Sequence, residues 1–160
     1  MTVRALTQPE KALARSIFGE AIDLDRVRIR RSPWWPFQPR NAIMAPDGDI
    51  WCHPRGPLWR DCYASAGLSM QALFVHEMVH VWQAQNGVIL PLAKLRAGDS
   101  DAAYRYDLDR QSFPEMNIEQ QARVVEHDFV LQRQETLITA RRPPFPADRY
   151  AALRGWWFKP

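Results

Sequence analysis

The most informative hydrophobic pattern of the chain lies between residues 67 and 85. Apolar side chains there cover almost every face that an α-helix would present, with Phe74, Met78 and Val81 on one side and Val75, Val79 and Trp82 on the flank. A helix that is apolar nearly all round is normally buried. Asn86-Gly87 follows as a typical C-terminal stop. The pattern therefore predicts a buried helix over residues 67–85.

A second helix is predicted to begin at Asn117. Gln120 stands three residues later, which completes a capping box. One face of this helix carries Glu119, Ala122, Glu126 and Val130. The helical pattern extends to about Thr139, and the Pro-rich run at 141–146 ends it.

A small sheet is predicted from three alternating segments. Residues 27–30 alternate between apolar and basic side chains, as a half-exposed strand does. Residues 41–44 and 49–53 flank Asp47-Gly48, and Asp-Gly between two such segments is a strong hairpin signal. Residues 50–52 are expected to form an edge strand to which an extended peptide adds.

Further helices are expected at both ends of the chain. Thr7 and Glu10 form a capping box for a helix that ends near Gly19. A short helix is predicted over residues 148–154, whereas residues 103–108 are expected to be extended.

Two aromatic segments have no regular pattern. Residues 32–39 contain three prolines and are predicted to be a loop that folds back on the core, with a partner-binding surface as the alternative. The C-terminal tail, residues 141–160, is aromatic and Pro-rich, and its aromatic residues at 156–158 are expected to fill the core, with a docking peptide as the alternative. The fold prediction is α+β, a single compact domain over residues 1–160, in which a small sheet with a hairpin packs on the buried helix.

Composition narrows the classes of function. The chain has 160 residues, a net charge of +3 and scattered basic residues, which favours an ordinary solvated surface over nucleic-acid binding. No apolar run approaches the length of a membrane span, and residues 1–20 show no secretory signal. The two cysteines, Cys52 and Cys62, are expected to be free thiols, with one disulfide as the alternative. These features predict a protein made in the cytoplasm, unless a dedicated secretion system exports it.

The buried helix also carries the sequence His76-Glu77-Met78-Val79-His80. Residues four apart share one helix face, so both imidazoles can bind a single metal ion. Glu77 lies beside that position and can accept a proton from a water molecule that the metal activates. The motif predicts a Zn²⁺ hydrolase in which His76 and His80 are ligands and Glu77 is the general base.

A catalytic zinc site usually needs a third protein ligand. A metzincin would have Gly and His three and six residues after His80, but Gln83 and Asn86 stand there. Candidates from the later part of the chain are Glu115, Glu119, Glu126, His127 and Asp128. Glu119 is favoured because it lies in the first turn of the second helix, where the helix dipole favours a carboxylate. Glu126 and His127 remain alternatives as ligands, and Glu126 is also a candidate to hydrogen-bond a ligand His.

The tetrahedral intermediate of peptide hydrolysis needs a hydrogen-bond donor for its oxyanion. Tyr106 is favoured as this catalytic residue, and Tyr104 and Gln83 remain open alternatives.

Together these residues resemble the gluzincin branch of the zincin metallopeptidases, and more closely the bacterial Vgr-related zinc metallopeptidases. The resemblance extends from Thr7 to about Val130. It is carried by HEMVHVWQAQ at 76–85, YRY at 104–106, NIEQQARVVE at 117–126, the opening LARSIFGEAIDLDRVRI at 13–29 and the hairpin MAPDGDI at 44–50.

This resemblance implies a zincin-like α+β domain associated with type VI secretion or a related contractile injection system. It implies His76, His80 and Glu119 as zinc ligands and Glu77 as the catalyst, and it specifies no substrate. Arg123 stands where gluzincins have an outer Asp, so that role would pass to another residue such as Glu126.

The function predicted is a zinc metallopeptidase that acts on a protein or peptide, with secretion-system spike or effector proteins as partners. The alternative is a zinc-containing structural or adaptor module of an injection machine without peptidase activity. A protein-binding domain that uses the aromatic loop and tail is a third hypothesis.

Overall fold

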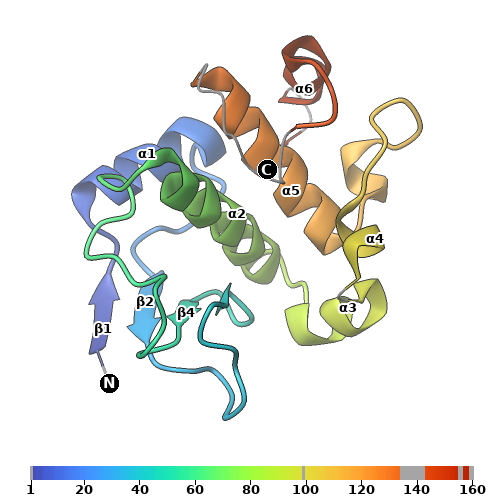
Figure 1. Ribbon diagram of the computed structural model, residues 1–160. Coiled ribbons are helices and arrows are strands. Elements are labelled where there is room, and N and C mark those ends of the chain that lie inside the picture. The colour runs from blue at the N-terminus through green and yellow to red at the C-terminus, as the bar shows by residue number, and fades with distance from the viewer. Residues whose placement is uncertain (1, 99, 134–142, 155–156, 159–160) are drawn as a thin grey trace.

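A computed structural model describes residues 2–98, 100–133, 143–154 and 157–158 (Figure 1). The elements in chain order are β1 (Thr2–Ala5), α1 (Gln8–Phe18), β2 (Arg28–Arg31), β3 (Ile43–Met44), β4 (Ile50–Cys52), α2 (Leu68–Gln85), α3 (Leu90–Ala97), α4 (Asp101–Tyr104), the 3₁₀ turn η1 (Phe113–Glu115), α5 (Ile118–Gln132) and α6 (Ala147–Arg154). The prediction of a mixed α+β fold is confirmed. No helix within the described ranges is long and apolar enough to cross a membrane.

The strands form one sheet in the order β1-β2-β4-β3. β3 and β4 form the antiparallel hairpin that Asp47-Gly48 predicts, and Gly48 adopts a φ of 92°, which few other residues tolerate. β2 is parallel to β4 and antiparallel to β1. The expectation that residues 50–52 form an edge strand is therefore wrong, because β4 pairs with a strand on each side, and the two edge strands are β1 and β3.

Helix α2 lies between the sheet and α5, as Figure 1 shows, and α5 is its main helical partner. Its bounds match the predicted buried helix. Ten of its residues between Ala72 and Gln83 are buried. The fully buried Ala122 of α5 leaves room for this approach. The predicted extension of α5 to Thr139 falls outside the described residues.

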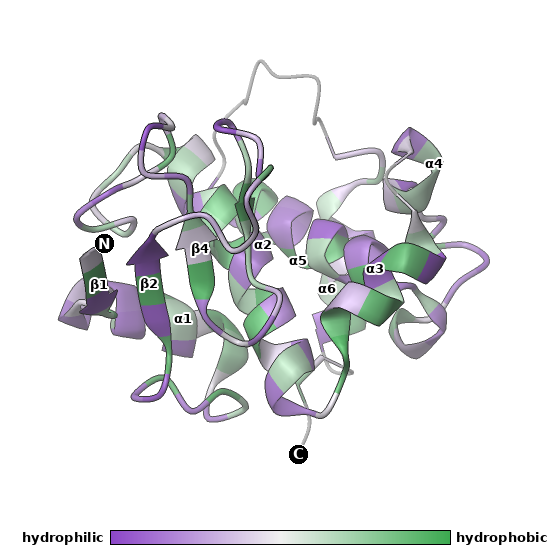
Figure 2. Cartoon of the chain, turned by 90° about the horizontal axis from the view of Figure 1, so that it is seen from below, coloured by the Kyte–Doolittle hydropathy of each residue, from purple (hydrophilic) through white to green (hydrophobic). Residues whose placement is uncertain are grey.

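The sheet contacts the helices through its alternating apolar side chains. Ile29 of β2 and Ile50 and Cys52 of β4 are fully buried, together with Tyr63 from the following loop. In Figure 2 a hydrophobic band lies between hydrophilic ones along β2, which is the pattern of a strand with one face on the core. The small sheet thus forms one wall of the core that supports α2.

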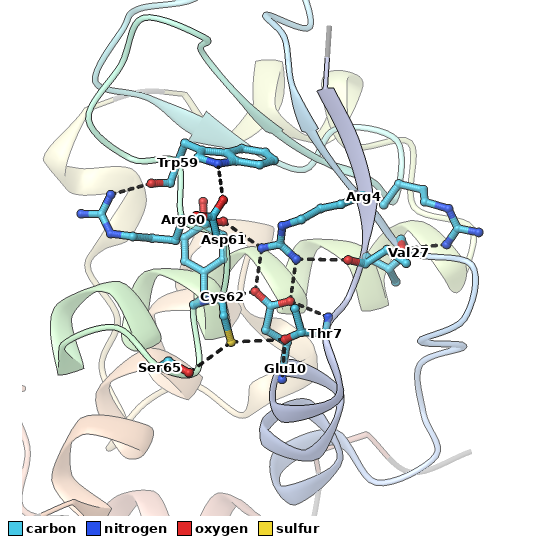
Figure 3. A network of polar contacts seen from close by, with 12 residues as sticks. Arg4, Thr7, Glu10, Val27, Trp59, Arg60, Asp61, Cys62 and Ser65 are labelled. Carbon is cyan, nitrogen blue, oxygen red and sulfur yellow. Dashed lines mark hydrogen bonds and ion pairs between the residues drawn. The ribbon is translucent and has the colours of Figure 1, made fainter.

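The N-terminal strand β1, which the hydrophobic pattern did not predict, is tied to α1 by an ion pair (Figure 3). Arg4 donates to both carboxylate oxygens of Glu10 at 2.7 and 2.8 Å. The same carboxylate accepts from the backbone N–H groups of Thr7 and Tyr63, both at 2.8 Å. Glu10 is therefore both the expected capping-box residue and a buried anchor that joins β1, α1 and the loop before α2.

Two short segments differ from the prediction. Residues 101–104 form the helix α4, so the expected extended piece over residues 103–108 is wrong in its first part. Residues 90–97 form α3, for which no helix was predicted because Pro91 interrupts the apolar run. Proline is tolerated there because it lies in the first turn, where its missing N–H would have no intrahelical partner.

The tail reaches the core, as predicted. Trp157 is buried and lies 5.8 Å from the Phe113 ring, and Phe158 lies 4.5 Å from Phe18 and 5.0 Å from Trp82. These contacts bring residues 157–158 onto α1, α2 and η1. Trp156 lies outside the described residues.

Candidate metal centre

The three predicted metal ligands meet between α2 and α5. His76 and His80 stand one turn apart on α2, and Glu119 stands in the first turn of α5. One oxygen of Glu119, Oε2, lies 3.5 Å from the Nε2 atom of each histidine. The three ligand atoms lie within 4.8 Å of one another, and all three residues are buried. Two imidazole nitrogens and one carboxylate oxygen in this arrangement fit zinc.

Each histidine is oriented by a hydrogen bond at its other ring nitrogen. His76 Nδ1 donates to Glu126 Oε2 at 2.9 Å, and His80 Nδ1 donates to Gln83 Oε1 at 2.8 Å. Both bonds direct Nε2 toward Glu119, which is how metal-binding histidines are commonly held. Glu126 therefore takes the outer position that the sequence suggested for it.

The charges around these ligands shift their pKa values in the metal-free protein. Burial lowers the pKa of His76, but hydrogen bonds with Glu119 and Glu126 outweigh it and raise the pKa to about 9. Burial raises the pKa of Glu119, but the two imidazoles outweigh it and hold that pKa well below its usual range. A metal ion bound here would replace the proton between the ligands.

Glu77 lies next to the ligand cluster. Its side chain is buried, and its Oε2 atom has no hydrogen-bond partner among the described residues. Burial raises the pKa of this carboxyl, and the imidazoles of His80 and His76 oppose the rise. An unpaired buried carboxylate oxygen costs free energy, so its position next to the ligand cluster calls for an explanation.

A cavity of about 570 Å³ opens over this cluster. Its floor includes His76, Glu77, His80 and Glu119. Its walls come from the loop 32–39, from the β3 hairpin and from α3 and the end of α4, with Trp34, Trp35, Ile43, Met44, Leu90, Pro91, Lys94 and Tyr104 among the lining residues. The ligand cluster is thus accessible from the cavity.

The aromatic loop does not fold back on the core as predicted. Trp34 and Trp35 are 41% and 43% exposed and line the cavity. The loop that contains Gly56 packs closely against Arg40, which directly follows the aromatic loop. Only glycine fits there, because a Cβ atom at position 56 would lie 1.8 Å from the Arg40 carbonyl oxygen. The two tryptophans are therefore exposed residues of the cavity wall.

The predicted oxyanion donors occupy three different positions. Tyr106 bonds to Tyr150 Oη and to His127 Nδ1, both at 2.5 Å, and is not among the residues that line the cavity. Gln83 holds His80 and also donates to Gln121 Oε1 at 2.8 Å. Tyr104 lines the cavity. The geometry thus favours Tyr104 over Tyr106 and Gln83.

The other candidate ligands also lie apart from the cluster. Glu115 is exposed and accepts hydrogen bonds from Ser112, and Asp128 is paired with Arg154 at 2.6 Å. His127 contacts Tyr106. Both cysteines are free, as predicted.

Lys94 is a charged residue of this cavity that the sequence analysis did not single out. Its Nζ atom donates to Glu119 Oε1 at 2.7 Å and to the Tyr104 hydroxyl at 2.8 Å. No spacing rule connects Lys94 with residues 76–80, because α3 reaches the site only through tertiary packing.

Comparison with known proteins gives one relative and one solved structure. No protein-family model matches the chain. Over 140 residues the chain is 36% identical to the type VI secretion system spike protein VgrG2b of Pseudomonas aeruginosa, a match that covers 82% of this chain and 13% of that protein. The solved structure of the effector domain of Pseudomonas aeruginosa VgrG2b superimposes with a TM-score of 0.71 at 34% identity, covering 81% of this chain and 75% of that domain. The chain therefore spans only a small part of the length of the spike protein that it matches.

Proposed function

The chain belongs to the family of the VgrG2b effector domain of type VI secretion, and from this premise we propose that it is a zinc-dependent metallopeptidase. The observation that supports the proposal is the convergence of His76, His80 and Glu119 beside an unpaired buried Glu77 at the floor of an open cavity. Metal-dependent hydrolysis of a peptide bond needs this combination of a metal site, a general base and access for a substrate.

In this reaction a bound zinc ion would act as a Lewis acid and lower the pKa of a water molecule. Glu77 accepts the proton of the attacking water and passes it to the leaving amine. Burial raises the pKa of the Glu77 carboxyl, which favours its taking up a proton from the water. Tyr104, which lines the cavity, is proposed as the donor to the oxyanion.

The cavity walls suggest the class of substrate. The edge strand β3 lines the cavity, and an edge strand can pair with an extended peptide. Trp34, Trp35 and Leu90 add apolar surface to the cavity wall. We propose that the substrate is an extended segment of a protein or peptide with a bulky apolar side chain near the scissile bond.

The family also suggests how the protein is used. VgrG2b is a spike protein of the type VI secretion system. We propose that this chain associates with spike or effector proteins of such a system, which would export it after synthesis in the cytoplasm.

The alternative is a zinc-containing structural or adaptor module without peptidase activity. Such a module needs the three ligands but has no use for Glu77. An Ala or Leu at this buried position would avoid the cost of an unpaired carboxylate oxygen. The carboxylate therefore favours the enzyme.

The test compares the wild type with Glu77→Gln. Both proteins are expected to bind one zinc ion per chain in metal analysis. Glu77→Gln is expected to cleave a peptide library at least about 100-fold more slowly, since a positioned general base typically contributes 10²–10⁴-fold. If both bind zinc and neither cleaves any peptide or unfolded protein, the structural module is favoured. If the wild type binds no metal after reconstitution, the metal centre itself is rejected.

A further inference from the structure

The two carboxylate oxygens of Glu119 have different surroundings. Oε2 lies 3.5 Å from both His76 Nε2 and His80 Nε2, so it occupies the ligand position. Oε1 accepts a hydrogen bond of 2.7 Å from Lys94 Nζ. An ammonium–carboxylate bond of this length is charge-assisted and about twice as strong as a neutral hydrogen bond.

Lys94 is itself held in place from the other side. Its Nζ atom donates to the Tyr104 hydroxyl at 2.8 Å and lies 4.8 Å from the centroid of the Tyr104 ring. The Glu119 side chain is only 6% exposed, and that of Lys94 is 32% exposed. The contact is therefore a partly buried clamp between α3 and α5 at the cavity wall, and not an ordinary surface ion pair.

A carboxylate can bind a metal ion through one oxygen or through both. Catalytic zinc sites keep three protein ligands and leave a position for water or substrate. If both oxygens of Glu119 became ligands, they would occupy that position. Lys94 competes with the metal for Oε1, because the oxygen that accepts the ammonium hydrogen bond is not free to turn toward the ion.

We propose that Lys94 is a positioning residue that restricts Glu119 to binding the metal through Oε2 alone and so keeps one coordination position open. This inference rests on the proposed zinc site. Each of the three ligands then has a hydrogen-bond partner of a different kind. His76 has the carboxylate of Glu126, His80 has the amide of Gln83, and Glu119 has the ammonium group of Lys94.

The test compares Lys94→Met, which keeps the length of the side chain but removes its charge, with Lys94→Arg, which keeps charge and donors. Lys11→Met is the matched control, because Lys11 lies on α1, outside the cavity, and pairs with the exposed Asp25. Each variant is loaded with cobalt for visible absorption spectroscopy and with zinc for a crystal structure. Binding of one metal ion per chain by the full-length protein is measured first.

The wild type, Lys94→Arg and Lys11→Met are expected to bind the ion through one oxygen of Glu119. In Lys94→Met both oxygens should coordinate, and the cobalt absorption should weaken because intensity falls as the coordination number rises. The kcat for peptide cleavage by Lys94→Met should fall about 10- to 100-fold, as for other partners of metal ligands, with KM little changed.

The outcomes separate this inference from the proposed function. If the wild type binds zinc through both oxygens of Glu119, or if Lys94→Met has the wild-type cobalt spectrum and one-oxygen binding, the role of Lys94 is overturned while the zinc site stands. If the wild type binds neither zinc nor cobalt, both proposals fail. A zinc protein without peptidase activity still tests Lys94, because the spectrum and the crystal structure need no substrate.

Discussion

At the scale of single residues, the most testable feature of the site is the bond between Glu126 and His76. Glu126→Ala removes the acceptor for His76 Nδ1, which lies 2.9 Å away. Loss of such a partner typically lowers metal affinity 10- to 100-fold, so we expect a loss of about 10-fold or more in competition with a chromophoric chelator.

Glu115→Ala is the control for that measurement, because Glu115 is an exposed glutamate that bonds to Ser112 outside the ligand cluster. Its zinc affinity should match the wild type. Equal affinities in all three proteins would show that Glu126 does not orient His76.

A second prediction concerns Glu10 and acid. Burial raises the pKa of this carboxyl, but hydrogen bonds from Arg4 and from two backbone N–H groups outweigh burial and lower it below the value of the unfolded chain. A lowered folded-state pKa contributes stability that is complete above the unfolded pKa and is lost as pH falls toward the folded pKa. The free energy of unfolding should therefore decrease below about pH 4.5, the ordinary Glu value.

Urea unfolding of the wild type and Glu10→Gln from pH 7 to pH 3 checks this effect. At pH 7 the variant should lose about 2–4 kcal/mol, somewhat less than the roughly 3–5 kcal/mol for a fully buried broken ion pair, because Arg4 is partly exposed. The difference in unfolding free energy between the two proteins should become smaller as the pH falls. A difference in unfolding free energy that stays constant from pH 7 to pH 3 would contradict the lowered pKa of Glu10.

The residues of the site differ in how far a sequence can predict them. His76, Glu77 and His80 lie on one helix, so their relative positions follow from helix geometry alone. Glu119 and Glu126 follow almost as directly, because capping at Asn117 sets the start of their helix. Lys94 and Tyr104 reach the cavity from segments whose placement depends on packing, and Tyr106, two residues beyond Tyr104, bonds to α6 instead.

At the scale of elements, the long helices were predictable and the short segments were not. The pattern of α2 and the capping boxes of α1 and α5 are local signals, and the structure has all three helices nearly as predicted. α3 has no side-chain cap, and β1 is four residues long, so both depend on tertiary contacts. The position of β3 at the sheet edge depends on the pairing of β2 with β4, which no local pattern encodes.

The start of α5 links helix stability to the metal site. The Asn117 side chain accepts hydrogen bonds from the N–H groups of Glu119 and Gln120. Asn117→Ala should cost about 1 kcal/mol of unfolding free energy and loosen the turn that carries Glu119, so zinc affinity should fall as well.

Thr7→Ala is the matched control, because Thr7 caps α1 and lies away from the ligands. Both variants should lose similar stability in urea unfolding, but only Asn117→Ala should lose affinity in a zinc titration. Equal zinc affinities would separate the cap from the metal site.

At the scale of the whole molecule, the candidate ligands come from two helices that are far apart in sequence. His76 and His80 belong to α2, Glu119 belongs to α5, and these two helices form the largest helix contact of the described fold. A metal ion at this place would bridge the α2 half of the chain, with its sheet, and the α5 half, with α6 and the tail. Metal binding should therefore stabilise the folded protein as a unit.

We expect zinc at 100 times its dissociation constant to add about 2.7 kcal/mol to the unfolding free energy. For a chain of this size that corresponds to a rise in Tm of about 5–10 °C, which excess chelator should reverse. In differential scanning calorimetry, Glu77→Gln should keep the full rise, because Glu77 is not part of the ligand group. His80→Ala should lose most of it, because the remaining two ligands hold zinc weakly. A zinc-dependent rise of equal size in His80→Ala and the wild type would place the ion elsewhere in the protein.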